Sequence, residues 1–259
     1  MVQNKLTNNK ILDRILKIGL PLVFWIGLWE VLSLFVSDRL KLFLPGPFQV
    51  FAKWFTVGFT PSYLEMAGIT LLRILVGFLL GVLVGFFLGI FTHGLKIIDY
   101  IFAPAMKVIR AVPVVSFIII AFLFVDVNNL PVVISFLMVV PLIWQSVHDS
   151  LANTSKELDA VSRLYNVGKM KTLVQVKLPQ ILPEFFSSCV SALGYAWKAG
   201  VAAEVLCTPA KSLGHIIYSA KAALNFDEVY AATLTVVLFS IIIEVLLKYI
   251  CGRILKKAS

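Results

Sequence analysis

Residues 74–95 read ILVGFLLGVLVGFFLGIFTHGL, a run of 22 residues that contains no Asp, Glu, Lys or Arg. A second uncharged run of 22 residues occupies positions 127–148. A helix needs about 20 apolar residues to cross the hydrocarbon core of a bilayer. The composition agrees, because 59% of the 259 residues are hydrophobic and only 14% are charged. The sequence therefore predicts an all-α integral membrane protein.

Six membrane-spanning helices account for the apolar segments of the chain. We expect these helices at residues 15–36, 69–92, 103–125, 130–148, 182–207 and 229–251. An N-terminal arm (1–14), a polar segment (149–181) and a tail (252–259) remain outside them, and all three are basic. Six spans place these basic parts on one side of the membrane, which the positive-inside rule makes the cytoplasmic side.

The net charge of +9 is interpreted in the same way, as a consequence of membrane topology and not as a signal for nucleic-acid binding. The N-terminal apolar run has no small-residue cleavage site, so it is expected to be a retained span. Residues 15–251, including the polar segment, are then a single transmembrane domain.

Glycine recurs at every fourth position of the second predicted span, at Gly77, Gly81, Gly85 and Gly89. Four-residue spacing makes one bare stripe along a helix, where a second helix can approach closely. We expect this contact to lie within the bundle, with a mobile or subunit-facing contact as the alternative.

Proline at Pro113, Pro131 and Pro141 is expected to kink or start helices. The thiols of Cys189, Cys207 and Cys251 have no metal or redox spacing and are expected to be buried.

The polar segment contains a short amphipathic helix between two apolar spans. Thr154 and Glu157 have the spacing of a capping box, which predicts that the helix starts at Thr154. Leu158, Val161 and Leu164 then recur at helical spacing, with polar residues on the other face. Such a helix outside the membrane suggests a surface on which another protein docks.

Charged side chains inside predicted spans are rare because they are costly in the bilayer, so they mark a water-filled path or a structural ion pair. Lys198 is the main candidate for lining a translocation path. Glu204 follows six residues later, on a different face of the same helix, so the two side chains are not expected to pair. Glu204 and Arg73 are further pathway candidates that could instead reach the membrane surface. Glu30 and Glu244 are expected to be structural.

The sequence lacks the motifs of several enzyme classes. It has no phosphate-binding loop, no His-Glu-x-x-His and no Gly-x-Ser-x-Gly motif, and its three histidines are far apart in sequence. No catalytic residue, metal site or cofactor site is therefore predicted. An intramembrane enzyme is disfavoured, whereas an ATP-independent secondary transporter or channel remains an alternative.

The polar segment resembles the coupling loop of ATP-binding-cassette (ABC) importer permeases. The family pattern is Glu-Ala-Ala, three residues, Gly, nine residues and Ile-x-Leu-Pro. Leu178-Pro179 matches its end, which aligns Asn166 with the Gly and residues 160–162 with Glu-Ala-Ala. A glycine that ends a helix commonly adopts a left-handed backbone conformation, and Asn is the residue that adopts it most readily after glycine. The family glutamate is absent, and Asp159 stands one position earlier.

Other segments resemble the nitrate/sulfonate/taurine type of this family. They are Leu44-Pro45-Gly46-Pro47, the stretch from Thr70 through Arg73 to Gly77, the stretch from Trp197-Lys198 to Ala203-Glu204, and Ser212-Leu213-Gly214. The resemblance covers nearly the whole chain in order. It implies the fold of type I ABC importer permeases.

The same resemblance implies the permease subunit of an ATP-driven importer in the cytoplasmic membrane of a prokaryote. The permease would form a homodimer, with a cytoplasmic ATPase subunit under each coupling segment and a solute-binding protein outside. ATP would be bound and hydrolysed by the partner, so the chain itself would be no enzyme. The cargo would be nitrate, a sulfonate, taurine, bicarbonate or a vitamin precursor. The implied ATPase-coupling residues are Leu158, Asp159, Ala160, Val161, Arg163, Leu164, Tyr165, Asn166 and Gly168.

Overall fold

A computed structural model of the chain describes residues 2–37 and 40–258, and every regular element among them is helical. The elements are α1 (Val2–Phe35), α2 (Pro47–Val57), α3 (Pro61–Gly94), α4 (Lys96–Ala111), α5 (Val114–Phe122), α6 (Leu130–Ala152), α7 (Lys156–Leu164), α8 (Lys169–Thr172), the π-helix η1 (Leu173–Lys177), α9 (Leu178–Cys207), α10 (Leu213–Ala222) and α11 (Phe226–Ala258). The predicted all-α class is confirmed for the described residues.

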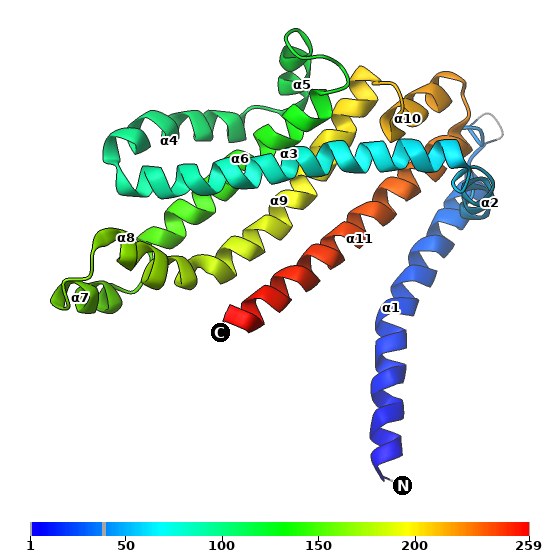
Figure 1. The fold of residues 1–259 in the computed structure, drawn as a ribbon. Helices are drawn as coiled ribbons and strands as arrows, with labels where there is room; N and C mark the ends of the chain where they lie inside the picture. The colour runs from blue at the N-terminus through cyan, green and yellow to red at the C-terminus, as the bar shows by residue number, and fades with distance from the viewer. Residues whose placement is uncertain (1, 38–39, 259) are drawn as a thin grey trace.

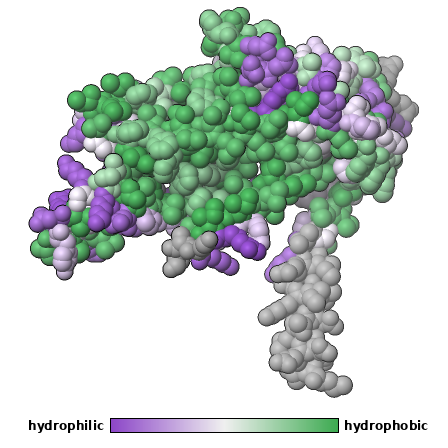
Figure 2. All heavy atoms as spheres, in the orientation of Figure 1, coloured by the Kyte–Doolittle hydropathy of each residue, from purple (hydrophilic) through white to green (hydrophobic). Residues whose placement is uncertain are grey.

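The centre of the molecule is a bundle of long helices in which α6 packs between α3 and α9. The buried core joins all three helices and includes Ile74, Phe78, Val139, Ile143 and Trp197. Figure 2 shows apolar residues over most of the flank of this bundle, with hydrophilic residues gathered toward its two ends. A protein surface that faces lipid is expected to be apolar in this way.

The glycine stripe of α3 is the contact surface for α6. A Cβ added at Gly81 would lie 2.6 Å from the Cβ of Val139, and one added at Gly89 would lie 2.8 Å from the Cβ of Val147. Such distances leave no room for a side chain, so the two backbones approach as closely as glycine allows. Packing within the bundle is therefore confirmed as the role of the stripe.

Among the described residues, three helices are long and apolar enough to cross a membrane: α3, α6 and α11. The predicted spans at 15–36 in α1 and at 182–207 in α9 do not meet this test. Helices α4 and α5 pass the same test only as a pair, with a bend of 103° between them, which is the arrangement of a broken span or of a re-entrant loop. The expected span at 103–125 is therefore broken into two helices, and the break lies at Pro113, which was expected to kink or start a helix. Pro113 has no N–H to donate and restricts the preceding residue, and α4 ends at Ala111, just before it. Pro131, by contrast, lies in the first turn of α6, as expected of a helix start.

The end of α11 and the short helix α7 lie toward one end of the bundle, and α1 projects away from the bundle with its start on the same lower side of the view (Figure 1). Helices α2, α5 and α10 lie toward the other end. We call these the α7 end and the α10 end.

Of the three cysteines, all free thiols, Cys189 and Cys251 are buried and Cys207 is partly buried.

Candidate functional site

The amphipathic helix α7 starts one or two residues later than its sequence signal indicates. The side chain of Ser155 is the N-cap and accepts a hydrogen bond from Leu158 N at 3.3 Å. Thr154 instead donates to the carbonyl of Leu151, so it closes the end of α6. The predicted capping role of Thr154 was therefore wrong, because two adjacent hydroxyl residues serve two adjacent helix ends.

The polar side of α7 faces the rest of the molecule. Ser162 is buried, and Asp159 forms an ion pair of 3.1 Å with Lys177 in η1. At the start of α7, Ser155 N donates to the side chain of Gln180 in α9. These contacts fix α7 against η1 and α9.

The apolar side of α7 points away from the chain. The exposed fraction is 77% for Leu164, 75% for Tyr165, 48% for Val161 and 46% for Leu158. Ala160 and Arg163 are also exposed, and Arg163 lies on the opposite side of the helix by helical spacing. We call Leu158, Val161, Leu164 and Tyr165 the α7 apolar face. Contiguous apolar groups at a polar end of a molecule are typical of a surface that binds another protein.

A turn with one left-handed residue ends α7. Asn166 has φ of 53°, and the N–H of Val167 donates to the carbonyl of Ser162 at 2.9 Å. Gly168 then caps the start of α8. The left-handed conformation expected of Asn166 at the glycine position is confirmed, since this residue type tolerates positive φ better than most.

Lys198 lies on an exposed face of α9. No ion pair or hydrogen bond of this side chain occurs among the described residues, so a structural ion pair within the chain does not account for it. Four more exposed residues share its side of the helix by helical spacing: Glu184, Ser187, Ser191 and Tyr195. We call these five residues the α9 polar face.

The α9 polar face leads into a polar cavity at the α7 end. This cavity has a volume of about 450 Å³ and lies between the end of α6 and the start of α9. Glu184 lines it together with Asp149, Asn153 and Gln180. Of the α9 polar face, only Lys198 was predicted as a pathway residue. Polar residues recur at three- and four-residue steps through an otherwise apolar helix, and this spacing was a signal for the whole face.

Glu204 is at the centre of a separate polar cluster at the α10 end. Its side chain is fully buried, and its Oε2 accepts hydrogen bonds from Thr70 Oγ1 at 2.8 Å and from Gly214 N at 3.3 Å. Thr70 Oγ1 in turn accepts a hydrogen bond from Leu213 N at 2.9 Å. The carboxylate therefore meets the first turn of α10, where free N–H groups and the helix dipole favour a negative charge.

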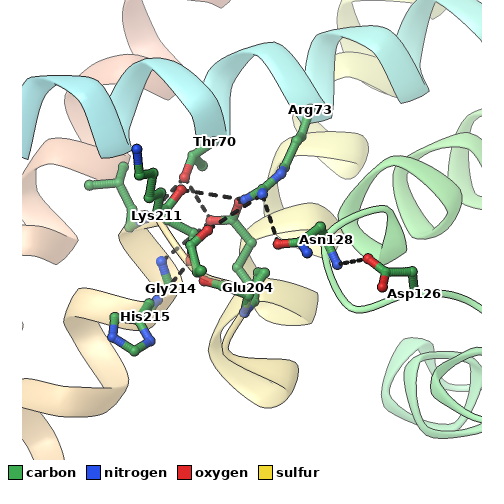
Figure 3. A network of polar contacts seen from close by, with 12 residues as sticks. Thr70, Arg73, Asp126, Asn128, Glu204, Lys211, Gly214 and His215 are labelled. Carbon is green, nitrogen blue, oxygen red and sulfur yellow. Dashed lines mark hydrogen bonds and ion pairs between the residues drawn. The ribbon is translucent and has the colours of Figure 1, made fainter.

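Arg73 completes this cluster from the next turn of α3 (Figure 3). Its Nη1 lies 3.7 Å from Glu204 Oε1, an oxygen that accepts no hydrogen bond from the described residues. The guanidinium also donates to Asn128 Oδ1 at 3.2 Å and to the carbonyls of Ala210 and Lys211. We call Thr70, Arg73, Asn128, Glu204 and Gly214 the Glu204 cluster.

The absence of side-chain atoms at Gly214 makes this arrangement possible. A Cβ there would collide with the backbone and Cβ of Glu204, so only glycine lets the start of α10 approach α9 so closely. As predicted, Lys198 and Glu204 do not contact each other, and the partners of Glu204 come from α3 and α10. The cluster joins Arg73 and Glu204, whereas Lys198 lies apart from them on the α9 polar face.

Other ionisable side chains of the described residues form smaller groups. Glu244 pairs with Lys248 one turn away on the surface of α11, at 2.5 Å. The rings of His93 and His148 lie 5.9 Å apart, closer than their sequence separation suggests, and His148 Nε2 is 3.5 Å from Asp99. Among the described residues, no three His, Cys, Asp or Glu side chains are grouped so as to hold a metal ion.

The sequence has relatives among membrane transport proteins. The nitrate import permease protein NrtB of Synechococcus elongatus is 26% identical over 214 residues, which cover 77% of this chain and 74% of NrtB. A probable ABC transporter permease of Haemophilus influenzae is 24% identical over 90% of this chain and 92% of its own length. The bicarbonate transport permease CmpB of S. elongatus is 23% identical over 78% of this chain and 76% of CmpB.

The fold also has a counterpart among solved structures. A chain of the MetNI methionine ABC transporter in an inward-facing conformation superposes with a TM-score of 0.55 and 18% identity. The superposition covers 86% of this chain and the whole of that chain. The similarity supports a permease fold of the MetNI kind.

The sequence profile of one protein family matches residues 77–256, which is more than half of the chain. That family is described as the inner membrane component of binding-protein-dependent transport systems. The match spans the glycine stripe, α7, the α9 polar face and most of the Glu204 cluster. Together with the nitrate and bicarbonate relatives, it confirms the resemblance to the nitrate/sulfonate/taurine type, and the chain belongs to this family of ABC importer permeases.

Proposed function

We propose that this chain is the transmembrane subunit of an ATP-driven importer that moves a small polar solute by alternating access. Two copies would form the permease, a cytoplasmic ATPase subunit would dock on each α7, and a solute-binding protein would deliver the cargo from outside. The α7 apolar face carries this proposal. Its side chains are exposed in the single chain, although burying them would be favourable by about 25 cal/mol per Å² of apolar surface.

The geometry of α7 suits the transmission of force. The Asp159–Lys177 ion pair and the Ser155–Gln180 hydrogen bond connect α7 to η1 and α9. Displacement of α7 by an ATPase would therefore move the start of α9, which carries the polar face. Packing along the glycine stripe would pass the movement through α6 to α3, since close-packed helices move as rigid units.

The proposed topology has six spans: α1, α3, the broken pair α4 and α5, α6, α9 and α11. The start of α1, the end of α11 and α7 lie on the same lower side of the view in Figure 1, which supports an even number of spans. The basic residues on this side favour the cytoplasm of a prokaryotic cell. The single domain would comprise residues 15–251.

The α9 polar face supports a translocation path between the two copies. Polar side chains that are exposed in a single membrane-protein chain are expected to contact another protein surface or water, because their contact with lipid is costly. A second copy facing α9 would enclose Lys198 and Tyr195 and exclude lipid from them. A lysine in that path favours an anionic cargo, in line with the nitrate and bicarbonate named for NrtB and CmpB.

Reconstitution of the transporter into sealed vesicles tests the proposal. The chain would be purified with its bound partners, and uptake of labelled nitrate and bicarbonate would be measured with ATP, without ATP and with a non-hydrolysable analogue. We expect uptake only with hydrolysable ATP and a copurified ATPase subunit. Uptake at the same rate without ATP would instead identify a channel or a secondary transporter.

A further inference from the structure

A second cavity lies at the α7 end, on the side of α7 opposite its apolar face. Its volume is about 520 Å³. The last turns of α3 form one wall through Ile90 and His93, and α7 forms another through Ser162 and Arg163. Helices α8 and η1 line the rest of the cavity, which lies between the amphipathic helix and the end of the apolar helix α3. We call it the α7–α3 cavity.

The charges that line the α7–α3 cavity are mostly positive. Arg163, Lys169 and Lys177 contribute three cations, and Asp159 contributes the one carboxylate. Asp159 is already paired with Lys177 at 3.1 Å. Among the described residues, no carboxylate lies within 4 Å of Arg163 or Lys169, so two cations remain uncompensated. Such a lining selects an anion, and a phosphate group accepts hydrogen bonds from both side chains.

The rest of the lining is apolar. Ile90, Val167 and Leu173 contribute hydrocarbon surface, and Leu173 packs against the central core of the bundle. An inorganic ion would leave this surface in contact with water. A ligand that carries both an anionic group and hydrocarbon would satisfy both parts of the lining.

The position of the cavity identifies where such a ligand is abundant. The apolar helix α3 ends at Gly94, a cavity residue, so the cavity lies at the level where hydrocarbon gives way to lipid headgroups. Basic pockets between membrane helices on the cytoplasmic side bind the headgroups of anionic lipids. Position, charge and apolar lining point to the same ligand.

We propose that the α7–α3 cavity binds the headgroup of an anionic phospholipid, with Arg163 and Lys169 holding its phosphate. The lipid bridges α7, α8 and the end of α3, three elements that are otherwise joined at this point by few polar contacts. Its binding stabilises α7 in the orientation seen here. This proposal is independent of the identity of the cargo and of the ATPase.

A thermal-unfolding experiment on the full chain in detergent tests the proposal. Phosphatidylglycerol is added to the micelles in increasing amounts, with phosphatidylcholine, which has no net charge, as the lipid control. We expect only phosphatidylglycerol to raise the unfolding temperature. Lys169→Gln should raise the amount of phosphatidylglycerol needed for half of the effect about fivefold, which corresponds to about 1 kcal/mol for one basic residue near a membrane surface.

Lys171→Gln is the matched control, because Lys171 lies in the same short helix, is exposed and does not line the cavity. It should bind phosphatidylglycerol as the native chain does, and so should Lys169→Arg, which retains the charge. Equal weakening in Lys169→Gln and Lys171→Gln would overturn the proposal in favour of general charge attraction. Stabilisation by glycerol 3-phosphate alone, lost in Lys169→Gln, would overturn the lipid assignment and indicate a soluble phosphate compound.

Discussion

The two ends of the bundle use polar and apolar groups in opposite ways. At the α10 end, the Glu204 cluster buries a carboxylate completely and surrounds it with donors from α3 and α10. At the α7 end, the polar side of α7 faces the chain, and Leu164 and Tyr165 are exposed to about three quarters of their surface. The first arrangement takes its hydrogen-bond donors from within the chain, whereas the second leaves apolar side chains that a further protein surface would cover.

This difference predicts which properties depend on each end. A buried charge that loses a partner destabilises the fold, because the remaining polar groups are left unpaired in a medium of low dielectric constant. An exposed apolar side chain contributes little to the stability of the single chain. Substitutions at the α10 end should therefore lower stability, whereas those on α7 should lower activity in a protein that is still folded.

The largest expected effect is that of Glu204→Ala. Removing the carboxylate leaves Thr70 and the Gly214 N–H without their acceptor and Arg73 without its ion-pair partner, and breaking such a buried pair costs about 3–5 kcal/mol. We expect the free energy of unfolding in detergent to fall by this amount. Glu204→Gln should lose less, because its amide oxygen can still accept from Thr70.

Glu244→Gln is the control for the removal of a membrane carboxylate. Glu244 pairs with Lys248 on an exposed surface, where ion pairs contribute about 0–1 kcal/mol. A loss of stability as large in Glu244→Gln as in Glu204→Ala would refute the distinction between the two sites.

The glycine stripe that connects the two ends gives the next effect. A Cβ at Gly77 would overlap the carbonyl oxygen of Val132 and lie 2.8 Å from the Cβ of Ser135, so Gly77→Ala must force α3 away from α6. Overpacking of this kind costs about 1–3 kcal/mol. Gly68→Ala in the same helix meets nothing within 4 Å and should be neutral or stabilising by up to about 1 kcal/mol. Unfolding of both variants in detergent measures the difference, and equal stabilities would contradict it.

Local sequence patterns predict the parts of this structure that depend on one segment at a time. The uncharged run at 74–95 predicts α3 and the glycine spacing predicts a helix contact, whereas the left-handed Asn166 is predicted from the family pattern that aligns this residue with a glycine. Each depends on neighbours a few positions away, where periodicity and backbone preference act directly.

The angle between two helices and the contacts between residues far apart in sequence were not predictable from local patterns. Pro113 predicts a break in the apolar stretch around it, but hydropathy carries no direction, so the size of the bend, 103°, was not predicted. Thr70 and Glu204 are 134 positions apart, and only the folded chain brings them together. The capping residue was missed because Thr154 and Ser155 are both suitable, and the choice depends on where α6 ends.

Leu164→Asp is expected to affect activity far more than stability. Leu164 is 77% exposed, so we expect the free energy of unfolding to change by less than about 1 kcal/mol, including the unfavourable charge at the end of a helix. If α7 docks on an ATPase subunit, a buried carboxylate at the contact should reduce ATP-driven uptake in vesicles at least about tenfold, or about 1.4 kcal/mol. ATP hydrolysis should then no longer be coupled to transport.

Leu164→Met is the matched variant, because it keeps an apolar side chain of similar size. It should transport as the native protein does. Normal uptake by Leu164→Asp would count against docking on the α7 apolar face, even if the protein proved to be ATP-driven.

Lys198→Ala tests the α9 polar face, the other exposed feature of the chain. Lys198 has no partner among the described residues, so its loss should leave stability and assembly with the ATPase unchanged. If it contacts an anionic cargo, uptake should fall about fivefold, the effect of one interaction worth about 1 kcal/mol. Lys198→Arg should retain most of the uptake. Unchanged uptake by Lys198→Ala would remove this residue from the translocation path.

The smallest effect is expected at Asn166, the left-handed residue that ends α7. Glycine adopts φ of 53° without strain but loses more conformational freedom on folding, so the two effects oppose each other in Asn166→Gly. We expect the free energy of unfolding to change by less than about 0.5 kcal/mol and uptake to be retained. Asn166→Ala has no such compensation and should cost about 1 kcal/mol, localised to α7, where hydrogen exchange would report faster opening. Equal exchange rates in the glycine and alanine variants would mean that this turn does not hold α7 in place.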